Sequence, residues 1–194
     1  MKRCIDFVGA AFLIMLLLPL LIFVVILILL DDGRPVLYRR RVVGIGGQFD
    51  AFKFRSMRRD ADAILNANPA LQAEFERNFK LKIDPRVTHV GSLLRKISLD
   101  ELPQLFNVFM GQMSLVGPRM FTAAELDKYG AYKELVLSVK PGLTGYWQVN
   151  GRQNVPYEER VQMDVYYIRN WSLLLDLKIL FLTPFKVLQR EGAY

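Results

Sequence analysis

The sequence predicts a mainly α-helical protein that has one short β-hairpin and an apolar membrane segment at its amino terminus. Residues 7–30 contain no charged side chain. Two short runs rich in β-branched and aromatic residues flank the glycine-rich turn at 44–47, which is typical of a hairpin. The remaining chain is divided by proline, glycine and capping residues into amphipathic segments of helical length. At 194 residues, the length suits an anchor at 1–32 followed by one compact domain at 33–194.

The composition narrows the class of protein. The net charge is +7 and 52% of the residues are hydrophobic. A basic balance of this kind indicates an anionic membrane surface, a phosphorylated substrate or nucleic acid. Cys4 and His89 are the single residues of their types, so they form neither an intrachain disulfide nor a zinc site. A bound metal would need oxygen ligands, which favours Mg²⁺ or Mn²⁺. His89 itself is expected to be an ordinary loop or surface residue.

The apolar segment is long enough to cross a bilayer. Its 24 residues would extend about 36 Å as a helix, and roughly 20 residues are needed to span. The run is too long for a signal peptide and lacks a small-x-small cleavage pattern, so we expect it to be retained. Pro19 lies in the middle and favours a kink. Basic residues flank both ends, so full spanning and re-entry on the same side fit the residues equally well.

The hairpin strands are expected at 35–43 and 48–54, around the turn at 44–47. These glycines do not match the dinucleotide-binding fingerprint, which leaves them a turn role. A basic cluster follows: Lys53, Arg55, Arg58 and Arg59. For Arg58 and Arg59 a surface facing solvent or lipid headgroups is the simplest interpretation.

Further helices are expected in several segments, namely 60–66, 69–80, from Ser98 to about Phe109 with Gly111 as the stop, 125–139 and 157–170. Leu102, Leu105, Phe106 and Phe109 repeat at helical spacing, which predicts a core face. The run KPGLTGYWQVNGR is dense in turn-forming residues. The last apolar segment, 171–189, is expected to be broken by Pro184 and to lie amphipathically in the membrane interface.

The stretch from Arg95 to Arg119 contains the best candidates for catalysis. Ser98 is expected to cap a helix and to form a capping box with Glu101, which places Asp100 and Glu101 in the first turn. A helix amino terminus carries partial positive charge and attracts anions. Arg95 and Arg119 could then hold phosphates that a carboxylate attacks. Acidic residues in a first helical turn are also common as simple caps, which is the alternative interpretation.

Several long motifs now give a resemblance. KRCIDFVGA, KFRSM, DPRVTHVGSLLRKISLDELPQLFNV, MSLVGPR, KPGLTGYWQVNGR and DVYYIRNWSLLLDLKIL occur in an order that resembles the bacterial sugar transferase family, the monotopic polyisoprenyl-phosphate hexose-1-phosphate transferases. The run GRQNVPYEERV is most similar to members that begin exopolysaccharide or O-antigen synthesis. The chain resembles the minimal catalytic core of the family. Three positions depart from its pattern: Leu18 replaces a common serine, Met120 replaces a second proline, and Gln112 replaces a frequent acidic residue.

The resemblance implies a reaction and a place for it. A UDP-sugar would donate its hexose 1-phosphate to undecaprenyl phosphate at the cytoplasmic face of the inner membrane, among phospholipids, and UMP would leave. Asp100 would be the nucleophile that forms a covalent phosphosugar intermediate. Glu101 would assist in acid-base chemistry and, with Asp100, bind Mg²⁺, or Mn²⁺. The resemblance also implies a re-entrant helix-break-helix anchor in a monotopic fold.

The resemblance further implies phosphate binding by Arg55, Arg95 and Arg119. From the residues themselves, Gln148, Asn150 and Arg152 could contact the nucleotide or the sugar, or could brace their loop. Self-association as a homodimer through the membrane-proximal surface is compatible with the sequence.

Two other classes of function fit the composition less well. A non-catalytic protein whose basic face binds anionic lipid would explain the charge and the apolar segments. It would leave the Asp100–Glu101 pair and the KPGLTGYWQVNGR loop without a role. Nucleic-acid binding is disfavoured, because the aromatic residues are not interleaved with basic ones as stacking platforms would be.

Overall fold

The computed structural model describes residues 1–78, 81, 84–151 and 155–188, and it is mainly helical with a short hairpin, as expected. The helices are α1 (Lys2–Asp32), α2 (Ala61–Asn66), α3 (Pro69–Asn78), α4 (His89–Lys96), α5 (Gln104–Met110), α6 (Ala123–Leu126), α7 (Lys133–Leu137), α8 (Tyr146–Asn150), α9 (Tyr157–Arg169) and α10 (Leu173–Leu188). Two 3₁₀ turns are η1 (Leu99–Glu101) and η2 (Asp127–Tyr132). The strands are β1 (Leu37–Gly44), β2 (Gly47–Phe54), β3 (Ser114–Val116) and β4 (Gly142–Thr144).

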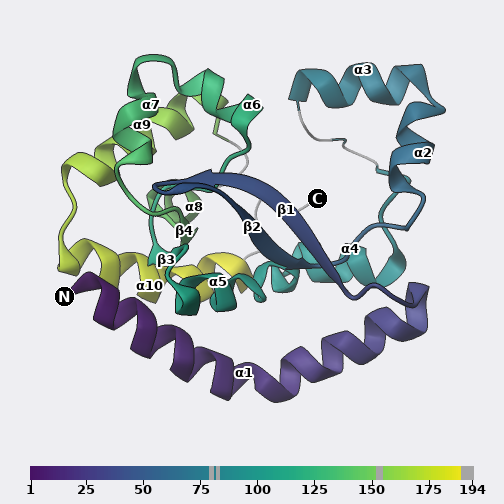
Figure 1. Cartoon of the computed structure of the whole chain (residues 1–194), viewed down its shortest axis with the longest axis horizontal. Helices are drawn as coiled ribbons and strands as arrows, with labels where there is room; N and C mark the ends of the chain where they lie inside the picture. Colours follow the sequence, from purple (N-terminus) through teal and green to yellow (C-terminus); the bar gives the residue numbers. More distant parts are fainter. Residues whose placement is uncertain (79–80, 82–83, 152–154, 189–194) are drawn as a thin grey trace.

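The membrane segment is a single helix that bends. Figure 1 shows α1 as a bowed helix along one edge of the molecule. Pro19 lies inside α1 and has no N–H to donate to the carbonyl of Met15, which accounts for a bend in this region. Among the described residues, α1 is the one helix long and apolar enough to cross a membrane. The expected apolar segment is therefore present as one bent helix, and its length and composition are compatible with membrane association.

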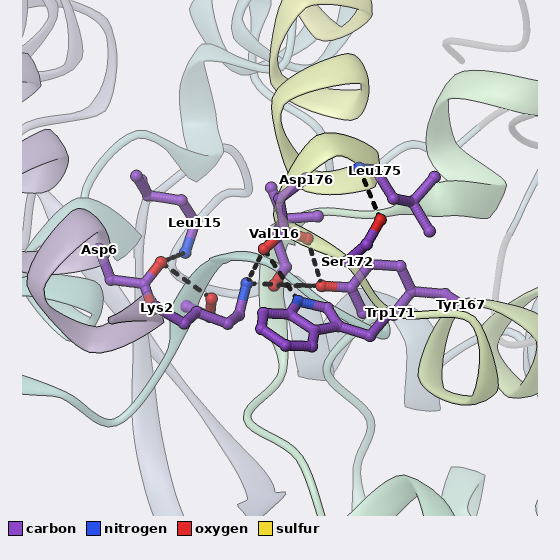
Figure 2. A network of polar contacts seen from close by, with 10 residues as sticks. Lys2, Asp6, Leu115, Val116, Tyr167, Trp171, Ser172, Leu175 and Asp176 are labelled. Atoms are coloured by element: carbon purple, nitrogen blue, oxygen red, sulfur yellow. Dashed lines mark hydrogen bonds and ion pairs between the residues drawn. The ribbon is translucent and has the colours of Figure 1, made fainter.

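The beginning of α1 is tied to the carboxyl-terminal part of the chain. Figure 2 shows Lys2 directed at the carboxylate of Asp176, with an Nζ to Oδ2 distance of 2.5 Å. Asp176 also accepts hydrogen bonds from the Tyr167 hydroxyl at 2.7 Å and from Trp171 Nε1 at 3.1 Å. The Asp176 carboxylate is buried but fully partnered, so the network fixes the start of α1 against the start of α10.

The first turns of α1 also hold α5 and β3. Arg3 donates hydrogen bonds to the carbonyls of Val108 and Phe109, at 2.6 and 2.7 Å. These carbonyls lie in the last turn of α5, where a cation complements the helix dipole. The buried Asp6 accepts a hydrogen bond from the backbone N–H of Leu115 at 2.9 Å. The amino-terminal end of α1 is thus built into the globular part of the protein.

The other end of α1 is attached to the same globular part. Asp31 accepts a hydrogen bond from the backbone N–H of Val90, in the first turn of α4, at 3.1 Å. Arg55 binds the carbonyl of Asp32 at 2.9 Å and its carboxylate at 2.9 Å. Arg59 donates to the same carbonyl at 2.9 Å. Both ends of α1 therefore contact the elements that flank η1.

The hairpin is joined to α5 by one buried amide. β1 and β2 pair antiparallel, with Gly44 opposite Gly47 at the turn, as the sequence predicted. On the free edge of β2, the Asn107 side chain accepts from the N–H of Phe52 at 2.9 Å and donates to the carbonyl of Asp50 at 2.8 Å. Asn107 has no exposed surface. It therefore continues the strand pairing and fixes α5 beside β2.

A second, two-stranded sheet lies at the centre of the globular part. β3 pairs with β4 in parallel, with Ser114 opposite Gly142 and Val116 opposite Thr144. All three residues of β3 are buried. Gly117 and Gly142 allow the backbones to approach, because a Cβ on Gly142 would lie 2.1 Å from the nitrogen of Gly117. Neither strand was predicted from the sequence, since strands of three residues carry no visible periodicity.

Three further expectations need correction. The helix expected at 125–139 is divided into α6, η2 and α7, because Gly130 adopts φ 52 and breaks the helical backbone. Pro184 lies inside α10 and does not break it. His89 is exposed, as expected, but it is the first residue of α4 and not part of a loop. The predicted helix at 157–170 is confirmed as α9.

Candidate active site

The acidic pair lies in a 3₁₀ turn between two helices. Asp100 and Glu101 belong to η1, which follows α4 and precedes α5. The expected capping box is wrong: Ser98 adopts φ 54 and its side chain makes no capping hydrogen bond. A residue in the left-handed region does not have the extended backbone of an N-cap. Pro103 takes the cap position, so α5 begins only at Gln104.

Lys53 is the nearest cation to the acidic pair. It extends from β2, and its Nζ lies 2.6 Å from Oε1 of Glu101. Burial opposes ionisation of Glu101, but Lys53 and Arg119 outweigh it and hold the pKa of Glu101 at about 2. Glu101 is therefore an anion at all physiological pH values.

Asp100 has the opposite electrostatic character. Only 9% of its surface is exposed. Burial raises the pKa of Asp100 to about 6 and the charge of Glu101 adds to the rise, against the opposing effects of Lys53 and Arg95. Two adjacent carboxylates thus differ in proton affinity because one is paired with a cation and the other is desolvated. Such divergence is typical of acidic pairs that do chemistry.

Two of the predicted phosphate-binding arginines lie beside this pair. Arg95, in the last turn of α4, donates from Nε to the Ser56 hydroxyl at 2.9 Å and interacts electrostatically with Asp100. Arg119 follows β3 and interacts with Glu101. Both arginines line one cavity together with Asp100 and Glu101. The structure therefore brings Arg95, Arg119 and the acidic pair together.

Arg55 is placed differently. It lines the same cavity, but its guanidinium binds the end of α1: it donates to the carbonyl of Gly33 at 2.8 Å in addition to its contacts with Asp32. A guanidinium at this position satisfies carbonyls that a helix carboxyl terminus leaves unpaired. In this structure Arg55 therefore joins the end of α1 to the segment that follows β2.

The remaining predicted residues are divided between the cavity and the surface. Gln148 lines the cavity, and its Nε2 donates to the carbonyl of Leu143 at 3.3 Å. Asn150 is exposed and bonds back to the carbonyl of Tyr146 at 2.8 Å, along the surface of α8. Arg152 lies outside the described residues. Of the two that are described, Gln148 is the one that lines the same cavity as the acidic pair.

Several site residues were missed by the sequence analysis. Lys53 was assigned to a basic cluster and not to the site, although it lies near the end of β2 and only two residues before Arg55. Arg40 in β1 forms an ion pair with Glu125 at 2.8 Å, and both line the cavity. The Trp147 ring lies near the guanidinium groups of Arg119 and Arg160, at 5.5 and 5.0 Å. No spacing in the sequence indicated these long-range pairs.

The cavity has a volume of about 1620 Å³ and combines two kinds of surface. Its lining combines the charged residues around η1 with mainly apolar residues of α1 and α10, and Lys186 of α10 also lines it. Large apolar side chains are exposed on α1, α5 and α10 near this region, including Phe12, Met15, Phe109, Phe181 and Phe185. Exposed apolar surface of this extent marks contact with a membrane or a partner. The charged part of the site therefore adjoins a surface suited to lipid.

The acidic pair could hold a metal only with help from a substrate. No group of three or more His, Cys, Asp or Glu side chains gathers within the part of the chain that the structure describes. Mg²⁺ is commonly bound through one or two carboxylates, with water and phosphate oxygens completing the octahedron. Asp100 and Glu101 fit this arrangement, provided that Glu101 exchanges its contact with Lys53.

The family assignment agrees with this geometry. A family model described as bacterial sugar transferase matches residues 1–190. The chain belongs to the bacterial sugar transferase family. Within it, the chain is 47% identical over 198 residues to the UDP-galactose-lipid carrier transferase of Erwinia amylovora. It is 45% identical over 199 residues to the undecaprenyl-phosphate galactose phosphotransferase of Salmonella typhimurium.

Coverage differs among these relatives. Each alignment covers 100% of this chain but only 42% of the Erwinia and Salmonella proteins. The exopolysaccharide production protein ExoY of Sinorhizobium fredii is 45% identical over 198 residues, which is 100% of this chain and 88% of ExoY. The family resemblance seen in the motifs is thus confirmed along the chain. The described cavity lies in the part that all three relatives share.

Proposed function

We propose that this protein transfers a sugar 1-phosphate from a UDP-sugar to undecaprenyl phosphate, releases UMP, and so begins the synthesis of a bacterial polysaccharide or other glycoconjugate. The observation that carries the proposal is the placement of Asp100 and Glu101 in one cavity with Lys53, Arg95 and Arg119. A diphosphate donor is strongly anionic, and this site offers cations together with one carboxylate of raised proton affinity. The names of the relatives support the donor and acceptor classes.

In the first step Asp100 is the nucleophile. One of its carboxylate oxygens forms a bond to the sugar-bearing phosphorus. The bond from that phosphorus to the bridging oxygen breaks, and UMP leaves with the electron pair. A carboxylate is a weak nucleophile in water, but burial raises the pKa of Asp100 and with it the basicity of the carboxylate. The product on the protein is an aspartyl-phosphosugar.

In the second step the lipid accepts the phosphosugar. A phosphate oxygen of undecaprenyl phosphate forms a bond to the same phosphorus, and the bond to the Asp100 oxygen breaks, which regenerates the carboxylate. The products are the sugar-diphospho-lipid and free protein. Dividing the transfer in this way means that a soluble donor and a membrane lipid need not occupy the site together.

The other residues have roles that follow from their charges. Arg119 and Arg95 are placed to contact phosphate oxygens, and Lys53 keeps Glu101 ionised. Asp100 and Glu101 would hold Mg²⁺ against the diphosphate, where the ion would neutralise charge on the leaving group. Mn²⁺ would serve similarly, since both ions prefer oxygen ligands.

We infer that α1 enters the membrane and returns to the same side, as a bent re-entrant helix. The contacts at its ends support this. Lys2 and Arg3 at the beginning, and Asp31 and Asp32 at the end, all bind the one globular part. A helix that crossed the bilayer would place these ends on opposite faces. With a nucleotide donor and basic flanks, the globular part would lie on the cytoplasmic face of the inner membrane, among phospholipids.

The competing hypothesis is a membrane-surface protein that binds anionic lipid without catalysis. It accounts for the basic charge and the exposed apolar helices. It does not account for the buried Asp100, because a surface that attracts anionic lipid gains nothing from a desolvated carboxylate. The two hypotheses differ in one prediction: only an enzyme should depend on Asp100.

The test is UMP release in nanodiscs, with a panel of UDP-sugars, Mg²⁺ and undecaprenyl phosphate. We expect turnover with at least one sugar in the wild-type protein and none in Asp100→Asn. Asp127→Asn is the matched control, because Asp127 is exposed and pairs with Lys133. An active Asp100→Asn variant would contradict the assigned nucleophile.

The intermediate needs a separate measurement. Without acceptor, the wild-type protein incubated with the active donor should gain the mass of one phosphosugar on the peptide that contains Asp100. If UMP appears only when donor and acceptor are present together, and no adduct is found, the transfer occurs in one step.

A further inference from the structure

The wall of the cavity formed by η2 and α9 contains a buried carboxylate that the proposed reaction does not use. Asp164 lies in α9 with only 1% of its surface exposed, and it lines the cavity together with Tyr129 of η2. Its Oδ2 accepts a hydrogen bond from the Tyr129 hydroxyl at 2.9 Å. Its Oδ1 makes no direct hydrogen bond with any described residue. A buried carboxylate that is only partly satisfied is costly to keep, so it calls for a role.

The backbone around Arg119 shows where that role lies. Arg119 pairs with Gly142 in an isolated parallel bridge, in which the N–H of Gly142 donates to the carbonyl of Pro118 at 2.8 Å. Because this hydrogen bond is made by the residue before Arg119, the N–H of Arg119 itself points away from Gly142. Two residues later, the carbonyl of Phe121 accepts from the N–H of Val43 at 3.0 Å. The segment is therefore extended, and the N–H of Arg119 needs a partner on its other side.

Asp164 lies on that other side. Burial raises the pKa of Asp164 to about 7, and the Tyr129 hydroxyl and the backbone N–H of Arg119 oppose that rise. The N–H of Arg119 thus acts on the carboxylate electrostatically, while Tyr129 binds it directly. One buried side chain of α9 therefore connects η2 to the backbone of a predicted phosphate-binding residue.

The side chain of Arg119 is also packed toward α9. Its guanidinium carbon lies 5.5 Å from the centre of the Trp147 ring. The guanidinium carbon of Arg160, one helical turn before Asp164, lies 5.0 Å from the same ring. Trp147 belongs to α8, which packs against α9. Both the backbone and the guanidinium of Arg119 thus contact groups that α8 and α9 position.

Tyr129 is fixed by aromatic packing. Its ring lies 5.0 Å from that of Phe121, in the segment that contains Arg119, and 6.2 Å from that of Tyr157, in the first turn of α9. Only 5% of its surface is exposed. A hydroxyl held by so rigid a ring has little freedom to turn away from Asp164. The arrangement is therefore built before any substrate binds.

We propose that Asp164 and Tyr129 are positioning residues for Arg119: they orient its backbone so that the guanidinium is held in the cavity, where the diphosphate of the donor would bind. The proposal rests on the proposed function, which gives Arg119 that phosphate. Asp164 and Tyr129 act through Arg119, so neither has to touch the substrate. A purely structural pair would stabilise the contact between η2 and α9 and would have no specific link to Arg119.

The test is a double-mutant cycle between Tyr129 and Arg119. Tyr129→Phe removes the hydroxyl and keeps the ring. Tyr132→Phe is the matched control, because Tyr132 ends the same turn and is not among the residues that line the cavity. Each change is made in the wild-type protein and in Arg119→Ala. KM for the UDP-sugar and kcat of UMP release are measured for all variants in nanodiscs.

We expect Tyr129→Phe to raise KM for the donor by about fivefold in the wild-type background, the equivalent of roughly 1 kcal/mol for one hydrogen bond. In Arg119→Ala the same change should leave KM unaltered, because there is no guanidinium left to position. Tyr132→Phe should leave KM unaltered in both backgrounds. An equal rise in both backgrounds, or no rise in either, would overturn the proposal.

A second pair of variants keeps the test valid if Tyr129→Phe does not fold. Asp164→Asn keeps an oxygen for the N–H of Arg119 and an amide that can donate to the Tyr129 oxygen, whereas Asp164→Ala removes both. We expect Asp164→Asn to stay near wild type and Asp164→Ala to raise KM about fivefold, again only when Arg119 is present. An asparagine variant as impaired as the alanine variant would overturn positioning by hydrogen bonds.

A binding measurement separates this proposal from the proposed function. If the wild-type protein releases no UMP from any donor, it is the proposed function that fails. The same cycle is then followed as the Kd of inorganic pyrophosphate, measured by calorimetry without turnover. We expect Tyr129→Phe to weaken pyrophosphate binding about fivefold, and only in protein that retains Arg119. Equal affinity with and without the Tyr129 hydroxyl would overturn the positioning role.

Discussion

The Nζ atom of Lys53 lies 2.6 Å from Oε1 of Glu101, and this contact gives the two neighbouring carboxylates different proton affinities. Lys53 lowers the pKa of Glu101 and also opposes the rise at Asp100. Without it, two adjacent anions would share a largely desolvated turn. The hairpin therefore contributes directly to the electrostatics of the acidic pair, although it lies far from it in sequence.

Replacing Lys53 should shift the activity to higher pH. In Lys53→Met the proton affinity of both carboxylates rises, so ionised Asp100 becomes populated only at more alkaline pH. We expect lower turnover at pH 7 and partial recovery at pH 9, measured as UMP release across that range. Arg39→Met is the control, because Arg39 is an exposed cation on the same hairpin and does not line the cavity. A profile parallel to wild type would show that Lys53 acts on binding alone.

Asp100→Asn should be more stable than the wild-type protein at neutral pH. The folded pKa of Asp100 is about 6, raised from 3.8. The folded state therefore binds the proton more tightly than the unfolded state, and this stabilisation is present below pH 4 and lost as pH rises through 6. We expect a gain on the order of 2 kcal/mol at pH 7.5.

The measurement is thermal unfolding in EDTA at pH 7.5 and pH 4. At pH 4 the difference between Asp100→Asn and wild type should disappear, because the wild-type carboxyl is then neutral in the folded state. Equal melting temperatures at pH 7.5 would mean that Asp100 is not desolvated in solution.

Arg55 and Arg119 should respond differently to substitution. Arg55→Ala removes the partner of Asp32 and of two carbonyls at the end of α1, so we expect a loss of about 2 kcal/mol in stability, between surface and buried ion pairs. Its KM for donor should change little. Arg119→Ala should instead raise KM for the UDP-sugar with unchanged melting temperature and membrane association. If Arg55→Ala raised KM for donor as strongly as Arg119→Ala does, Arg55 would also bind phosphate.

Gly91→Ala should disturb the site through the backbone. A Cβ at Gly91 would lie 2.1 Å from the carbonyl oxygen of Ser56, the residue whose hydroxyl holds Arg95. The clash is with backbone, so α4 must move, at a cost of about 1–3 kcal/mol. Gly46→Ala is the matched control, since nothing lies within 4 Å of the corresponding position. Equal stability and turnover in both variants would mean that α4 is not fixed against β2 here.

The sequence predicted the elements whose signals are local. The uncharged run at 7–30, the glycine turn at 44–47 and the periodic helix at 157–170 all specify their own conformation. The strands β3 and β4 could not be found this way, because three residues each carry no period, and their pairing depends on the approach of Gly117 to Gly142. Ser98 was misassigned for a similar reason: the left-handed backbone that it adopts between α4 and η1 has no local signal in the sequence.

The same distinction between local and long-range signals applies to the candidate site. Asp100, Glu101, Arg95 and Arg119 belong to motifs that are continuous or nearly so in sequence, and the structure brings them together. Lys53, Arg40 and Glu125 come from the hairpin and α6, and only the fold joins them. Arg55 was assigned by motif alone. In the structure its guanidinium pairs with Asp32 at the end of α1, and the sequence did not predict the path of that helix.

In the re-entrant arrangement that we propose, the double attachment of α1 sets how deeply the protein sits in a bilayer. Arg3 caps the last turn of α5 and Asp31 binds the first turn of α4, so the two helices on either side of the acidic turn are each held by one end of the same apolar element. The distance between Asp100 and the most deeply inserted part of α1 is therefore fixed by the protein and does not vary with the thickness of the bilayer. A lipid phosphate arriving at the interface meets the carboxylate at a level that the protein has already set.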